Sequence, residues 1–195
     1  MDERLDKLLK NAFFGNPEER ENAVVWLITM LERENCNATI GGYATAEDFY
    51  RQTVPAELLT VAVDSKVQAE LARRVATFAG KVKEMSICFV LLGKMQTNAA
   101  LMPVVEVITA YEKQFDAMTL RHAHYALTAL LGLPIDKNGR PTGASLPKAL
   151  VSSGLVPALT RFVRDSLRSS DYDVQEAAAT SKHFLEAYGV MLSDE

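Results

Sequence analysis

Histidines are the residues best suited to acid–base or metal chemistry in this chain of 195 residues, and two of the three, His122 and His124, lie two positions apart. In a helix, residues two apart point about 200° away from each other, so this pair cannot hold one metal ion. Helical metal-binding pairs are three or four positions apart. The spacing indicates two structural histidines, one exposed and one partly packed, and predicts no metal site and no cofactor.

A second candidate site is a group of arginines. Arg161, Arg164 and Arg168 recur at helical spacing, so they could form a basic patch that contacts an acidic partner or a phosphate group. Asp165 lies between them at a spacing suited to ion pairing along a helix. A solvated face whose charges pair internally is therefore the alternative, and the sequence favours it without excluding the first.

No catalytic residue is predicted. The sequence contains no nucleophile elbow, phosphate-binding loop or dinucleotide fingerprint. Acidic residues such as Asp64, Glu84 and Glu106 are scattered, and nothing pairs them as acid and base. These observations favour a protein that is not an enzyme.

Charge and hydropathy limit the partners. The formal net charge is −4, whereas phosphate binding needs a basic face, so nucleic acid is not expected as the main partner. The first residues, Met1 to Arg4, do not resemble a secretion signal, and the longest apolar run, Ile87 to Leu92, is too short to cross a bilayer. We therefore expect no membrane insertion and a cytoplasmic location. Cys88, inside that run, is predicted to be a buried thiol, and it shows no metal-ligand spacing with Cys36.

Helical periodicity extends over almost the whole chain, and strand signals are scarce, so the fold class is predicted to be all-α. Three stripes of apolar residues recur at helical spacing: Ala23, Trp26, Leu27, Met30 and Leu31; Val67, Leu71, Val75 and Phe78; Met118, Ala123, Leu127, Leu130 and Leu131. Side chains that can cap a helix precede the predicted helices: Asn16, Thr45, Asp64, Asp116 and either Asp171 or Asp173. Glycine-containing loops at 35–44 and 134–143 are expected to connect these helices.

Internal repetition is carried by three prolines, each of which follows a medium-sized apolar residue. Pro55, Pro103 and Pro157 are each predicted to open a helix, and the last two are 54 positions apart. The same offset relates Ala123 to Ala177. One such unit cannot bury its apolar face alone, so the units must stack.

The last unit resembles an armadillo repeat. The resemblance rests on Gly154 to Leu159, then Phe162-Val163, the turn Ser169-Ser170-Asp171, and Val174 to Ala178. It implies a single helical-repeat domain over 1–195, a right-handed α-α superhelix of the armadillo or HEAT-like kind. About four units are expected, over residues 1–35, 45–83, 84–133 and 144–192.

The resemblance also places a binding surface on the concave face. Peptide-binding armadillo proteins carry a ladder of tryptophan and asparagine there. In this chain the tryptophan positions hold Tyr125 and Ala179, and the asparagine positions hold Ala129 and His183. Because only Trp26, in the first unit, is a tryptophan, we do not expect an extended nuclear-import peptide to be gripped in the family's manner.

The sequence thus favours a non-catalytic scaffold or adaptor that presents its concave face to a protein partner. A compact α-helical enzyme or small-ligand-binding protein, and a chaperone-associated factor, remain alternatives. An apolar stripe at the C-terminus is expected to be uncapped and to support self-association: Ala177, Phe184, Tyr188, Val190 and Met191.

Overall fold

The computed structural model describes residues 1–33, 45–95, 97–132 and 146–192, and every regular element in these ranges is a helix. In chain order the helices are α1 (Glu3–Phe14), α2 (Pro17–Leu31), α3 (Ala46–Thr53), α4 (Ser65–Ala79), α5 (Ser86–Gly93), η2 (Asn98–Ala100), α6 (Leu101–Tyr111), η3 (Glu112–Gln114), α7 (Ala117–Leu131), α8 (Lys148–Ser152), α9 (Val156–Leu167) and α10 (Tyr172–Ala187). The all-α prediction is confirmed for these ranges. Cys36 and the predicted loops at 35–44 and 134–143 lie outside the described residues.

Helix starts follow the capping residues that the sequence predicts. The Asn16 side chain accepts a hydrogen bond from the Glu19 amide, and the Glu19 carboxylate accepts one from the Asn16 amide, which completes a capping box. Four more of the predicted side chains cap helices by accepting bonds from first-turn amides: Thr45, Asp64, Asp116 and Asp171. Each such cap contributes about 0.5–2 kcal/mol to stability.

The three prolines of the predicted repeat occupy different positions. Pro157 lies in the first turn of α9, as predicted. Pro103 is the third residue of α6, whose helical path already begins in η2. Pro55 opens no helix, because α3 ends at Thr53 and residues 56–60 form successive turns. The prediction was wrong for Pro55, since a proline φ near −65° suits the start of a turn as well as the start of a helix.

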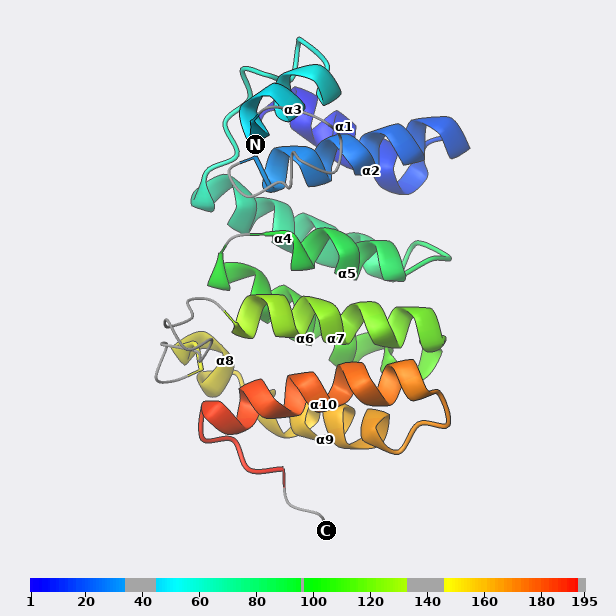
Figure 1. The fold of residues 1–195 in the computed structure, drawn as a ribbon, viewed down its shortest axis with the longest axis vertical. Coiled ribbons are helices and arrows are strands. Elements are labelled where there is room, and N and C mark those ends of the chain that lie inside the picture. The colour runs from blue at the N-terminus through cyan, green and yellow to red at the C-terminus, as the bar shows by residue number, and fades with distance from the viewer. Residues whose placement is uncertain (34–44, 96, 133–145, 193–195) are drawn as a thin grey trace.

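Helices stack in layers along the longest axis of the molecule, with the two termini at opposite ends (Figure 1). Successive layers contain α1 with α2, α4 with α5, α6 with α7, and α9 with α10. Contacts between layers form two columns, one of α1, α4, α6 and α9, the other of α2, α5, α7 and α10. The unit boundary expected between residues 83 and 84 falls between α4 and α5, which share a layer.

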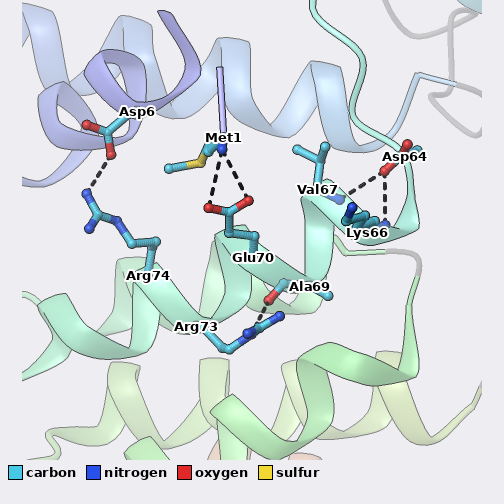
Figure 2. A network of polar contacts seen from close by, with 9 residues as sticks. All are labelled: Met1, Asp6, Asp64, Lys66, Val67, Ala69, Glu70, Arg73 and Arg74. Atoms are coloured by element: carbon cyan, nitrogen blue, oxygen red, sulfur yellow. Dashed lines mark hydrogen bonds and ion pairs between the residues drawn. The ribbon is translucent and has the colours of Figure 1, made fainter. Parts of the chain in front are cut away.

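The first two layers are connected by what we name the N-terminal joint, the contact of α1 with α4. Two ion pairs cross it, as Figure 2 shows: Asp6 lies 2.6 Å from Arg74, and the Met1 amino group lies 3.3 Å from Glu70. Three aromatic rings pack beside them, with Phe78 in edge-to-face contact with both of its partners, Phe13 and Phe14. Residues along α1 meet α4 residues in the same order, so the two helices run parallel.

Near the other end lies the C-terminal joint, the contact of α7 with α10. Arg121 lies 2.6 Å from Asp173, and His124 Nδ1 lies 3.0 Å from Ser181 Oγ. The hydrogen-bonded partners of α7 residues lie 52 to 57 positions later in the chain, so α7 and α10 also run parallel. Parallel packing aligns equivalent positions of successive layers along one face of the column.

The C-terminal apolar stripe is largely covered. Ala177 is buried, the Phe184 ring packs against Gly132, and the Tyr188 hydroxyl donates a hydrogen bond to the Leu131 carbonyl. Of the stripe, Met191 is strongly exposed, at 81%. Self-association through this end stays a prediction, but most of the apolar surface on which it depended packs within the chain.

Candidate functional site

The exposed side of α7 carries one continuous row of residues. Met118, His122, Tyr125 and Ala129 follow each other at intervals of four, three and four, which places them on one side of the helix. Tyr125 is 54% exposed and Met118 is 51% exposed. The prediction that Met118 belongs to the buried stripe was wrong, because it lies nine positions from Leu127 and therefore about 180° around the helix.

A matching row lies on α10. Ala179 and His183 are exposed and are the positional equivalents, one layer later, of Tyr125 and Ala129. Because α7 and α10 are packed in parallel, the two rows lie on neighbouring helices of one column. The structure therefore exposes all four candidate positions that the sequence placed on the concave face.

A cleft of about 530 Å³ adjoins Tyr125 on the side of α5. Its walls are mainly apolar and come from α5, the residues after it, and α7: Phe89, Val90, Gly93, Met95, Ala126 and Ala129. A Cβ at Gly93 would lie 3.0 Å from the Ala126 Cα, so α5 and α7 approach closely here. Tyr125 and Ala129 line this cleft, whereas Ala179 and His183 do not.

Polar groups at the rim of the cleft come from three helices or their ends. The Lys94 ammonium lies 2.7 Å from the Glu32 carboxylate and joins the end of α2 to the end of α5. The His122 ring contacts Tyr125 edge to face, with 6.2 Å between centroids. Burial, reinforced by the nearby Arg121 charge and opposed by Asp116, lowers the pKa of His122 and so favours the neutral imidazole.

Sequence reasoning missed Glu32, Lys94 and Gly93. Glu32 and Lys94 are 62 positions apart, so no local pattern links them. One signal was present for Gly93, which interrupts a strongly apolar helix and allows a neighbouring backbone to approach.

His124 lies on the other side of α7 and is fully buried, which corrects the expectation of one exposed and one partly packed histidine. Its ring stacks on Phe162 at 4.7 Å, and burial lowers its pKa to about 3. The neutral ring can donate from Nδ1 to the Ser181 hydroxyl, which in turn donates to the His124 carbonyl. His124 is therefore a packed structural residue of the C-terminal joint.

The candidate basic patch lies on α9, away from this face. Arg161 pairs with Glu112 of η3 at 2.8 Å, so its charge is neutralised by the preceding layer. Arg164 is half-buried and Arg168 is exposed. Arg161 and Asp165 line a cleft of about 610 Å³ with Glu112, but the ion pair that forms there is the one between layers.

Known proteins do not identify the site. The chain matches no family model, no curated protein and no solved structure.

In the part of the chain that the structure describes, no three His, Cys, Asp or Glu side chains are grouped so that they could hold a metal ion. None of the described helices has both the length and the apolar character needed to cross a membrane. Cys88 is buried as predicted, and burial raises the pKa of its thiol to about 12.

Proposed function

We propose that this protein is a non-catalytic scaffold that binds a protein partner on the face formed by α7 and α10, with the cleft beside Tyr125 as its anchor site. We take the stacked layers to be a short right-handed superhelix of the armadillo or HEAT-like kind, with this face on its concave side. The partner's own side chain would fill the cleft.

The observation that carries this proposal is the exposure of Tyr125 beside an apolar cleft. A tyrosine that is 54% exposed presents a large apolar ring and a hydroxyl to solvent. Residues that dominate binding energy are commonly tyrosine, tryptophan and arginine, set beside pockets at the centre of an interface. Small residues that line the cleft with it, Ala126 and Ala129, leave room for a partner to approach the helix surface.

The test is affinity purification with quantitative mass spectrometry, in which the wild type is compared with a Tyr125→Ala/His183→Ala variant. A matched control is Val151→Ala, since Val151 is 58% exposed but lies on α8. We expect a partner retained at fixed stoichiometry by the wild type and the control, and about tenfold or more weaker binding of the purified partner by the double variant. Equal binding by all three forms would contradict the proposal.

A second candidate function, binding of a small molecule, is favoured by the size of the same cleft. Its volume of about 530 Å³ lies within the usual range of ligand sites, and His122, Tyr125 and the Glu32–Lys94 pair supply polar groups at its rim. Native mass spectrometry of the purified protein distinguishes the two functions. A co-purifying small molecule that is lost on Ala129→Trp, which fills the cleft, would favour this second function.

A further inference from the structure

A small pocket of about 280 Å³ lies between the α1–α2 turn and the α4–α5 connection. Both connections lie at the right-hand edge of the stack in Figure 1. Three of the side chains that line the pocket are cationic, Arg20, Lys81 and Lys83, and one is anionic, Glu84. No residue of the face proposed above lines it.

Among the described residues, the three cations have no charged partner. Across residues 1–33, 45–95, 97–132 and 146–192, neither Arg20 nor the two lysines form an ion pair or a side-chain hydrogen bond. Arg20 Nε is buried and has no hydrogen-bond acceptor in the structure. Since Arg20 lines the pocket and no carboxylate of the described residues pairs with its guanidinium, an anion in the pocket would supply the missing counter-charge.

The start of α5 adds to this positive field. Helix α5 begins at Ser86, beside Lys83 and Glu84, and no side chain caps its N-terminus. The Ile87 and Cys88 amides already donate to the Glu84 and Met85 carbonyls, so this end contributes the positive field of the helix dipole rather than two free donors.

The charge and size of the pocket indicate which kind of anion it binds. Three cations and one carboxylate give the lining a formal charge of +2, which matches the −1.5 to −2 of a phosphoryl group at neutral pH better than the −1 of a carboxylate. The pocket is too small for a nucleotide but large enough for one phosphoryl group. Its remaining wall is apolar, formed by Ala12, Phe13, Val82 and Ile87, and would contact the carbon chain that carries the phosphate.

We propose that this pocket binds a phosphorylated side chain of a protein partner, with Arg20, Lys81 and Lys83 as its cationic contacts. The proposal rests on the scaffold function only in taking the carrier to be a protein. Because the test uses purified small probes, its failure would not affect the evidence for the Tyr125 face.

The test is an ¹⁵N–¹H NMR titration of the full chain at constant ionic strength with three probes: inorganic phosphate, O-phospho-N-acetylserine amide and N-acetylserine amide. We expect saturable shifts of the Arg20 Nε–H signal and of the amides of residues 83–88 with the phosphorylated amide, weaker binding of inorganic phosphate, and no binding of the unphosphorylated amide. Equal affinity for inorganic phosphate and the phosphorylated amide would overturn the proposal, because the carrier would then make no contact.

Variants distinguish specific binding in the pocket from nonspecific electrostatic attraction to the protein. Lys81→Ala/Lys83→Ala should weaken binding of the phosphorylated amide about tenfold or more. The control, Lys66→Ala/Lys148→Ala, removes the same charge from two exposed lysines outside the pocket and should leave binding unchanged. Glu84→Gln should tighten binding, because it removes the one carboxylate of the lining. Equal weakening by both double variants, or absence of saturable shifts in the wild type, would overturn the proposal.

Discussion

The two joints connect layers of the same stack by different chemistry. The N-terminal joint combines ion pairs with exposed or half-buried members and three aromatic rings, of which Phe13 and Phe78 are buried and Phe14 is 51% exposed. The C-terminal joint also has one partly exposed ion pair, but its centre packs buried small residues around the pair formed by His124 and Ser181, neither of which is exposed. Surface ion pairs contribute little net free energy, whereas buried packing contributes most of it. The comparison indicates that the layers carrying Tyr125 and His183 are held more firmly than the first layer.

The largest effect is expected from the core beneath the C-terminal joint. Leu127 is fully buried, so Leu127→Ala should lower the free energy of unfolding by about 2–5 kcal/mol, through lost apolar burial and the cavity left behind. Met118→Ala, on the exposed side of the same helix, is the control and should change it by less than about 0.5 kcal/mol. Urea denaturation measures the free energy of unfolding of both variants. Equal losses would show that the side of α7 carrying Leu127 is not the buried one.

Acidification should weaken the C-terminal joint through His124. Its pKa falls from an ordinary 6.5 to about 3 in the folded state, so the unfolded chain takes up a proton that the folded chain does not. The contribution is fully present above pH 6.5 and is lost as the pH falls towards 3, by up to about 1.4 kcal/mol for each pH unit. Four carboxyls have a pKa lowered in the folded state from ordinary values of 3.8 or 4.5, so their contributions are lost mainly below pH 5: Asp2, Asp6, Glu47 and Asp116.

The measurement is urea denaturation of the wild type and of His124→Gln at pH 7 and pH 5. We expect the wild type to lose about 2 kcal/mol more than the variant over this interval. The variant also corrects for His122, whose lowered pKa acts in the same direction in both proteins. Parallel losses in the two proteins would show that His124 is not the group responsible.

At the N-terminal joint, removal of an aromatic ring should have a smaller and more local effect. Phe14 contacts Phe78 edge to face, with 5.1 Å between centroids, so Phe14→Ala should cost about 0.5–1.5 kcal/mol. Hydrogen exchange should show faster exchange in α1 and α2 and unchanged protection in α7 and α10. Val25→Ala, a comparably exposed residue of α2, is the control. Faster exchange throughout the chain would contradict the distinction between the two joints.

The smallest effect is expected from the ion pair between Asp6 and Arg74. Lys10 and Arg74 lower the pKa of Asp6, yet the pair is partly solvated, so Asp6→Asn should cost only about 0.2–1 kcal/mol. The cost should shrink in 1 M salt, where charges are screened within about 3 Å. Denaturation at low and high salt, with Glu21→Gln as the control, measures it. A salt-independent cost would show that Asp6 acts through packing.

Much of the helical framework could be predicted from the sequence because its signals are local. Asn16, Thr45, Asp64 and Asp116 bond to amides two or three residues away, so each helix start is encoded beside it. The helix predicted after the Asp64 cap, with its apolar stripe from Val67 to Phe78, is confirmed as α4. Pro55 was misread because a proline fixes φ but does not choose between a helix and a turn.

The structure exposes Tyr125, Ala129, Ala179 and His183, the positions that the armadillo resemblance placed on a concave face, and their role in binding stays a prediction. The partner of Arg161 was not predictable, since the sequence offered Asp165 nearby and the structure uses Glu112, 49 positions away. The burial of His124 was likewise hidden, because it depends on Phe162 and Ser181 from other helices.

The sequence by itself therefore determined which segments are helical, where they begin, and which side of most of them is apolar, because caps and periodicity act within a few residues. Only the tertiary structure decided what meets across the layers. The pair of Glu32 with Lys94, and the pocket shared by Arg20 and Lys83, each join residues about sixty positions apart. Such contacts depend on how far, and in which direction, each layer is shifted relative to the preceding layer. No local pattern in the chain specifies that shift.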